Sequence, residues 1–126
     1  MPSISFGKMP YKVGRLGFGI MRLPVLANGK VNFGLSTPMI RYALEHGVNF
    51  LDSHHNYHNG ESEEAIGKAI RGIPRDSLVL QTKIGMYNDY REDDCRRLLA
   101  QALKKMKTGY LDFYFTHSLN WTDHLK

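Results

Sequence analysis

The sequence predicts an α/β fold with a parallel sheet, and two observations lead to it. Four apolar runs of strand length alternate with three stretches in which apolar residues recur at helical spacing. An alternation of this kind is typical of parallel strands joined by crossover helices. With 126 residues, 42% of them apolar and 23% charged, the chain is expected to form one globular domain over residues 1–126.

The N-terminal segment predicts a short hairpin before the sheet begins. Residues 4–6 and 11–13 have the composition of strands and are separated by a turn that contains glycine and proline. Residues 15–21 then predict the first buried strand, in which Gly17 and Gly19 permit close approach of another backbone. The spacing of these glycines differs from the G-x-G-x-x-G dinucleotide fingerprint, so that motif is not assigned.

Three helices are predicted from periodicity and from signals at their ends. Ser36-Thr37-Pro38 predicts the start of the first helix, with a hydroxyl at the N-cap and proline in the first turn, and His46-Gly47 predicts its end. Residues 62–71 predict the second helix, because acidic residues gather near its start and basic residues near its end, as the helix dipole favours. Residues 93–107 predict the third helix from their apolar spacing.

The other three predicted strands each end on an ionisable side chain. Residues 48–52 end on Asp52, residues 78–83 on Lys83, and residues 111–117 on His117. Side chains alternate along a strand, so residues of one parity share a face. With that face turned inward, an acid, a base and an imidazole meet at the C-terminal rim of the sheet, where parallel α/β barrels carry their active sites.

Tyr57 adds a phenol to this rim, in a polar loop five residues after Asp52. A phenol has a pKa of about 10 in water and is a poor proton donor at neutral pH. A lysine ammonium group beside it favours the ionised phenol, and a carboxylate keeps the lysine charged. Tyr57 is therefore a candidate general acid toward an oxygen that gains negative charge, and His117 a candidate hydrogen-bond donor to the same oxygen.

The distribution of apolar and charged residues indicates where the protein is located and which partners it binds. No run approaches about eighteen apolar residues, the length of a membrane span, and the first ten residues lack the apolar core of a signal peptide. A cytoplasmic location and no membrane partner are therefore expected. The net charge of +5 is scattered over helical faces, which favours solvated side chains over a nucleic-acid interface.

Cysteine and histidine bear on metal sites. The single cysteine, Cys95, excludes an internal disulfide and an iron–sulfur cluster held by several cysteines of this chain. His54, His55 and His58 cluster near Asp52, and imidazoles four residues apart chelate a metal where their segment is helical. The intervening residues predict an irregular loop, so no metal site is assigned.

Several segments together resemble a known family, in the right order and spacing over nearly the whole chain. They are Arg15-Leu-Gly-Phe-Gly-Ile-Met-Arg-Leu-Pro24, Gly47-Val-Asn-Phe-Leu-Asp52, Tyr57 with Asn59-Gly-Glu-Ser-Glu63, Ile66-Gly67, Gln81-Thr-Lys83 and Tyr110-Leu-Asp-Phe-Tyr-Phe-Thr-His117. The chain resembles the N-terminal part of an aldo-keto reductase. Met21-Arg-Leu-Pro24 and His117-Ser-Leu-Asn120 are most similar to a prokaryotic branch that often carries a C-terminal iron–sulfur domain; no iron–sulfur cluster is expected within these 126 residues.

The resemblance implies a (β/α)8 TIM barrel that reduces an aldehyde or ketone with a nicotinamide cofactor, usually NADPH and otherwise NADH. Tyr57 matches the family's proton donor, Lys83 and Asp52 match the pair that tunes it, and His117 matches the residue that orients the carbonyl. One departure is local: the family commonly has alanine after the Asp-Ser step, whereas His54 follows Ser53 here. That difference bears on the lining of the pocket.

The resemblance also implies where the cofactor would lie. The backbone of Gly19, Ile20 and Met21 matches the segment that lies against the nicotinamide ribose, next to Asp52. The residues that bind the pyrophosphate and the 2′-phosphate come mainly from the family's second half, so weak cofactor binding is expected of these residues alone.

Length is the larger departure, because a barrel of this type takes about 250 residues. The expectation is the N-terminal half of a barrel, comprising the hairpin and about four βα units. Such a half leaves open sheet edges, so the chain is expected to self-associate, to pair with a complementary half, or to be poorly stable alone. Two functions stay open: a reductase within a complete barrel, and a non-catalytic remnant or interaction module that has kept the four residues.

Overall fold

The computed structural model describes residues 2–85 and 91–118, so residues 119 and 120 of the last family motif lie outside it. An antiparallel hairpin, β1 (Ser3–Ser5) and β2 (Lys12–Gly14), opens the chain. A parallel sheet follows in the order β3-β4-β5-β6, formed by β3 (Phe18–Gly19), β4 (Phe50–Asp52), β5 (Val79–Gly85) and β6 (Phe113–His117). The predicted hairpin and the parallel α/β sheet are confirmed.

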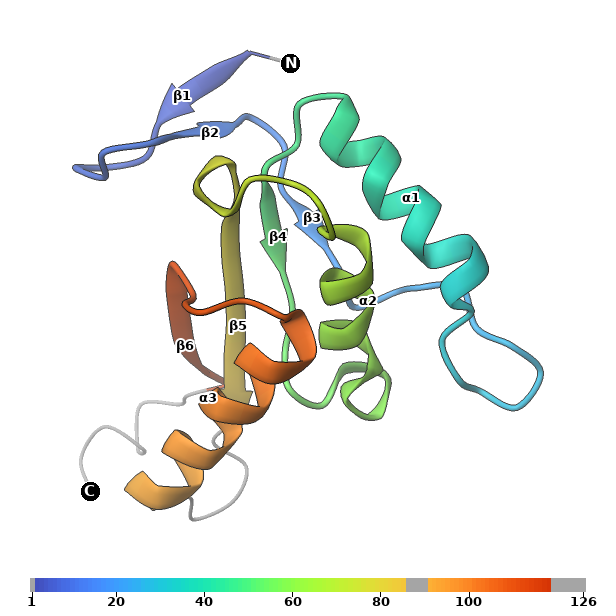
Figure 1. Ribbon diagram of the computed structural model, residues 1–126. Helices are drawn as coiled ribbons and strands as arrows, with labels where there is room; N and C mark the ends of the chain where they lie inside the picture. Colours follow the sequence, from blue (N-terminus) through green and yellow to red (C-terminus); the bar gives the residue numbers. More distant parts are fainter. Residues whose placement is uncertain (1, 86–90, 119–126) are drawn as a thin grey trace.

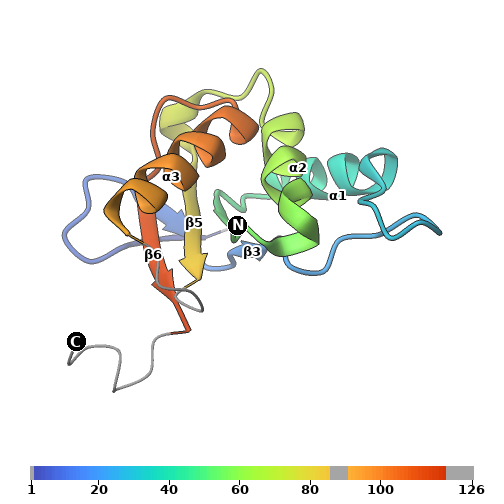
Figure 2. The ribbon, with the colours of Figure 1, turned by 90° about the horizontal axis from the view of Figure 1, so that it is seen from below.

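Three helices connect the strands of the sheet and cover one of its faces (Figures 1 and 2). They are α1 (Phe33–Glu45), α2 (Glu61–Ala69) and α3 (Glu92–Met106), with short 3-10 turns η1 (Tyr57–Gly60) and η2 (Arg75–Ser77). No helix in the described part of the chain has the length and apolar character needed to cross a bilayer.

Several predicted boundaries are wrong. The strand predicted to end on Lys83 continues to Gly85, and the strands predicted from residues 48 and 111 begin at Phe50 and Phe113. The first helix begins at Phe33 and not at Ser36, because the side chain of Asn32 accepts a hydrogen bond from Leu35 N at 3.3 Å and caps the helix one turn earlier. Pro38 therefore lies inside α1. The first strand of the sheet covers only Phe18–Gly19 of the predicted residues 15–21.

The hydrophobic core lies between the helices and the outer face of the sheet. Leu51 and Leu80 supply it from the strands, and Ile40, Ile66 and Met106 from the three helices; all five are fully buried. The two strand residues, Leu51 and Leu80, point to the face opposite to that of Asp52 and Lys83, as the alternation of side chains along a strand predicts.

The inner face of the sheet is lined by aromatic side chains. Phe50 and Phe113 lie on neighbouring parts of this face, and Phe6 from the hairpin contacts both, with ring centroids 6.0 Å and 5.5 Å away. The hairpin therefore covers the N-terminal end of the inner face. Phe115, one layer further along β6, is 46% exposed.

The two edges of the sheet are open within the described residues. There β3 pairs only with β4, and β6 only with β5. Parallel strands are normally buried on both faces and paired on both sides. The described residues thus form a sheet that further strands can extend at either edge.

Arg75 ties the N-terminal ends of β5 and β6 together. Its guanidinium group lies 2.6 Å from the Asp112 carboxylate and also donates to Leu78 O at 2.8 Å and to Thr108 Oγ1 at 2.9 Å. Asp112 in turn accepts a hydrogen bond from Leu80 N at 2.8 Å. Both charges are thereby held by backbone and side-chain partners at the base of the sheet.

Candidate functional site

Asp52 and Lys83 form an ion pair at the opposite, C-terminal end of the sheet. The pairing of β4 with β5 places Asp52 opposite Gln81, so Lys83 lies one layer higher on the same face. Its Nζ is 2.6 Å and 2.7 Å from the two carboxylate oxygens of Asp52, and it also donates to Ser53 O at 3.0 Å. The Gln81 side-chain amide is a further donor to Asp52. The direction of the ammonium group is therefore fixed by three hydrogen-bond acceptors.

Tyr57 lies beside this ion pair. The Lys83 Nζ is 5.5 Å from the centroid of the Tyr57 ring. The loop reverses sharply after Tyr57, because His58, Asn59 and Gly60 all adopt positive φ (51°, 55° and 88°) before α2 begins. Left-handed backbone at two non-glycine residues is costly and is characteristic of functional loops. The His58 ring offsets part of that cost, since its Nε2 accepts a hydrogen bond from Leu23 N at 3.2 Å.

His117 reaches the same rim from β6. It ends that strand, and the strand register places it opposite Gly85. The structure thus brings all four predicted residues, Asp52, Tyr57, Lys83 and His117, to one end of the sheet. Their assignment as catalytic residues stays a prediction.

The three residues expected beside a nicotinamide ribose also lie at this rim. Gly19 pairs with Asp52 in the sheet, and Ile20 N donates to Asp52 O at 2.8 Å. No heavy atom comes within 4 Å of the position that a Cβ on Gly19 would occupy, and Met21 is 44% exposed. The backbone is therefore open at Gly19, which leaves room for a flat group against it, whereas Ile20 is fully buried.

The sequence prediction missed His54 as part of this rim. Ser53 N donates to Gln81 O at 3.0 Å and His55 N to Lys83 O at 3.2 Å, so the parallel pairing with β5 continues beyond the end of β4. Alternation then places His54 on the same side as Asp52. Extending the parity of the second strand by two residues would have found it.

His54 is buried among the other rings of the site. Its side chain is 1% exposed, and its ring centroid lies 4.4 Å from that of His55, 5.0 Å from Tyr57 and 4.8 Å from His117. Burial first, and then the neighbouring His55, His117 and Lys83, together lower the pKa of His54 from 6.5 to about 4. The imidazole is therefore neutral at physiological pH.

The open question of a metal chelated by the histidines finds no support in this geometry. His54 Nδ1 accepts a hydrogen bond from Asn56 N at 3.0 Å, whereas His58 Nε2 is directed to Leu23 N. Over residues 2–85 and 91–118, no three His, Cys, Asp or Glu side chains are grouped closely enough to hold a metal ion.

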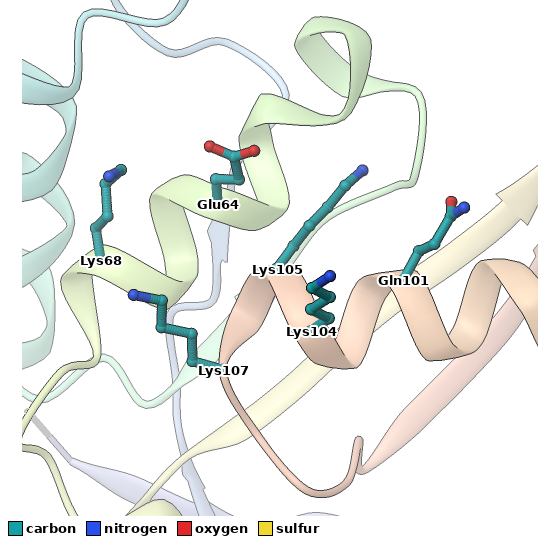
Figure 3. A pocket seen from close by; sticks show the side chains of 6 residues that line it. All are labelled: Glu64, Lys68, Gln101, Lys104, Lys105 and Lys107. Atoms are coloured by element: carbon teal, nitrogen blue, oxygen red, sulfur yellow. The ribbon is translucent and has the colours of Figure 1, made fainter.

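A hollow of about 490 Å³ lies away from the rim, on the outer surface between α2 and α3 (Figure 3). Its lining is mostly cationic and consists of Glu64, Lys68, Gln101, Lys104, Lys105 and Lys107. Lysines are favoured at the end of α3 by the negative end of the helix dipole. Lys68 lies 4.8 Å from the Phe33 ring centroid and Lys105 pairs with Glu63 at 3.4 Å, so structural roles account for both.

Comparison with known proteins decides the family. The model of the aldo/keto reductase family matches residues 15–125. The chain belongs to the aldo/keto reductase family. It is 31% identical to the aldo-keto reductase YhdN of Bacillus subtilis and 26% identical to an NADH-specific methylglyoxal reductase of Escherichia coli, over 90% and 93% of this chain.

Solved structures of aldo-keto reductases share the fold. The holo form of AKR11C1 from Bacillus halodurans superposes with a TM-score of 0.81 at 26% identity, covering 99% of this chain and 43% of that one. A Klebsiella pneumoniae aldo-keto reductase in complex with NADPH gives a TM-score of 0.72 at 28% identity, covering 84% and 36%. The described sheet is thus part of a (β/α)8 barrel, as the sequence predicted.

The chain spans less than half the length of these relatives. It covers 36% of the Bacillus subtilis protein and 42% of the Escherichia coli reductase. Of the relatives, one is described as NADH-specific and another was solved with NADPH. The family therefore uses both nicotinamide cofactors.

Proposed function

We propose that this chain supplies the proton-donating side of a carbonyl reductase site, in which an aldehyde or ketone is reduced to an alcohol. The observation that supports this most strongly is the position of the Lys83 ammonium group, 2.6 Å from the Asp52 carboxylate and 5.5 Å from the Tyr57 ring centroid. A phenol beside a fixed positive charge releases its proton more readily. Tyr57 is the proposed general acid.

Each of the other residues has a distinct proposed role. Asp52 holds Lys83 in its charged form and directs its N–H groups, while Ser53 O accepts from the same ammonium group at 3.0 Å. His117 is proposed to donate a hydrogen bond to the carbonyl oxygen and so to fix its direction. A bound nicotinamide would supply the hydride to the carbonyl carbon, and Tyr57 the proton to the oxygen, which together give the alcohol.

NADPH is the proposed cofactor, with NADH as the alternative. The segment Gly19, Ile20 and Met21, next to Asp52, would hold its nicotinamide ribose; Gly19 and Met21 are open there, whereas Ile20 is fully buried. The net charge of +5 gives no separate support for NADPH, because it is spread over the whole chain.

We also propose that the described sheet functions as one part of a closed barrel. Its open edges at β3 and β6 and the 46% exposure of Phe115 favour coverage by a complementary half barrel or by a second copy of the chain. The same edges favour the second candidate function, a non-catalytic interaction module. The cytoplasmic location stays a prediction.

Carbonyl-dependent oxidation of NADPH tests the proposed reductase. The wild-type chain is assayed with a panel of aldehydes and ketones, alone and over a range of protein concentrations, beside Tyr57→Phe. Activity that rises with self-association and falls at least about a hundredfold in Tyr57→Phe supports the proposal. A chain that binds NADPH and shows no turnover with any carbonyl favours the interaction module.

A further inference from the structure

His54 is a buried imidazole that touches two residues of the proposed reductase site at once. Its ring centroid lies 5.0 Å from that of Tyr57 and 4.8 Å from that of His117, and the ring is only 1% exposed. Stacked or tilted rings at such distances are in van der Waals contact. The loop residue therefore lies between a group of the β4 side and a group of β6, which are far apart in sequence.

The orientation of the His54 ring is fixed by the backbone. Asn56 N donates a hydrogen bond to His54 Nδ1 at 3.0 Å, and a backbone N–H is always a donor. The neutral ring must then carry its proton on Nε2. The chain is held on both sides of the ring as well, because His55 N donates to Lys83 O at 3.2 Å and Tyr57 N to His54 O at 3.1 Å.

Burial is the main reason that the His54 ring is neutral. His55, Tyr57, Lys83 and His117 surround it, and burial first, then His55, His117 and Lys83, oppose a second proton, in line with the pKa of about 4. A charged imidazole here would repel Lys83. Burial makes the ring a fixed, uncharged spacer between two groups that must be placed accurately.

We propose that His54 is a positioning residue: its ring, oriented by Asn56 N, sets the placement of the Tyr57 phenol relative to His117. The inference rests on the proposed reductase function, because that reaction needs both groups at one carbonyl oxygen. Misplacement of a reacting group by about 1 Å can cost about a hundredfold in rate. This proposal gives a structural role to His54, at a position where the resemblance leads one to expect alanine.

Two substitutions separate the ring from its backbone hydrogen bond. His54→Phe keeps a ring of similar shape and loses the acceptor for Asn56 N. His54→Asn keeps an acceptor that can reach the N–H two residues on, as in an Asx turn, and loses the ring. His54→Ala removes both. A matched control is His46→Ala, which removes a His ring stacked on Tyr42 at 4.0 Å on the surface of α1.

The expected result is that kcat falls about tenfold or more in His54→Ala and His54→Asn, while the Kd for NADPH and the activity of His46→Ala stay within about threefold of wild type. His54→Phe is expected to keep most of kcat. The nuclear Overhauser contact between the Tyr57 ring and the Lys83 side chain, measured without substrate, is expected to weaken in the same two variants that lose kcat.

The outcomes separate this inference from the function on which it rests. An active wild type whose kcat and Tyr57–Lys83 contact are unchanged in His54→Ala overturns the positioning role alone. Loss in His54→Phe with retention in His54→Asn overturns it too, because the ring would then be dispensable. A wild type that binds NADPH without turnover overturns the proposed reductase, and the inference with it.

Discussion

The sheet carries an aspartate–cation pair at each end, and the two pairs differ in what surrounds them. At the base, Arg75 lies 2.6 Å from Asp112, and the same guanidinium group donates to three carbonyl or hydroxyl oxygens of the connecting loops. At the rim, Lys83 lies 2.6 Å from Asp52 and near the Tyr57 ring. The two ion pairs have the same nitrogen–oxygen distance but different surroundings.

The partners of each pair explain the difference. The base pair ties strands to loops through backbone groups, and its carboxylate is only 8% exposed. The rim pair lies on the inner face, with Asp52 30% exposed and with aromatic rings of two segments, the loop after β4 and the end of β6, at the same rim. An ion pair that is buried and bonded mainly to backbone groups stabilises the fold. An ion pair that lies beside a phenol and is open to solvent is a candidate for a catalytic role.

Breaking the base pair is expected to have the largest effect on stability. Arg75→Ala leaves the Asp112 carboxylate buried without its cation, which costs about 3 kcal/mol or more in the free energy of unfolding. Urea denaturation measures that cost. Arg96→Ala is the control, since its pair with Glu92 is 74% and 76% exposed and its loss is expected to cost under about 1 kcal/mol. Equal costs for both substitutions would contradict the structural role of the base pair.

The free energy of unfolding is expected to decrease at low pH because His54 becomes protonated in the unfolded chain. The pKa of His54 is about 4 in the fold against 6.5 for a free imidazole, so the unfolded chain takes up a proton first as the pH falls. Stability is fully present above pH 6.5 and decreases toward pH 4, by up to about 3 kcal/mol.

His54→Phe isolates this contribution from the other titrating groups of the rim. Its pH dependence of unfolding, between pH 4 and pH 6.5, is expected to be shallower than that of the wild type. Identical slopes for the two proteins would show that His54 is not the group responsible.

Breaking the rim pair is expected to cost less stability than breaking the base pair and to have a large effect on the proposed activity. Lys83→Met removes a cation that is 13% exposed but leaves the Asp52 carboxylate, which is 30% exposed and can be hydrated, so the free energy of unfolding is expected to fall by about 1–2 kcal/mol. Carbonyl-dependent NADPH oxidation is expected to fall by about a hundredfold or more. Thermal or urea denaturation beside the assay gives both numbers, and a loss of stability as large as that of Arg75→Ala would remove the contrast between the two ends.

Much of this organisation follows from local sequence signals. Alternation along the strands placed Asp52, Lys83 and His117 on one face, because side-chain direction in a strand depends only on parity. The start of α1 was missed because Ser36 and Asn32 are both suitable caps, and only the folded chain shows which one accepts the N–H of Leu35.

The role of the loop after β4 could not be predicted in the same way. The pairing of residues 53 and 55 with β5 continues the strand geometry through a segment whose composition indicates a loop. The positive φ at His58 and Asn59 is likewise imposed by tertiary contacts, such as the hydrogen bond from Leu23 N. Asn59-Gly60 is a local turn signal and strand parity gives the side on which His54 lies, but the composition of residues 53–56 indicates a loop, so only the folded chain shows that the pairing continues and buries His54.

Mapping the NADPH site by NMR chemical-shift perturbation tests the central claim most directly. The account predicts saturable shifts at the rim, for Gly19, Asp52 and Lys83, with none at Arg75 and Asp112 at the base. The hollow between α2 and α3 is predicted to be unaffected as well. Shifts that gather at its lysines, or no shifts at millimolar NADPH, would contradict the assignment of the rim as the cofactor and catalytic end of the sheet.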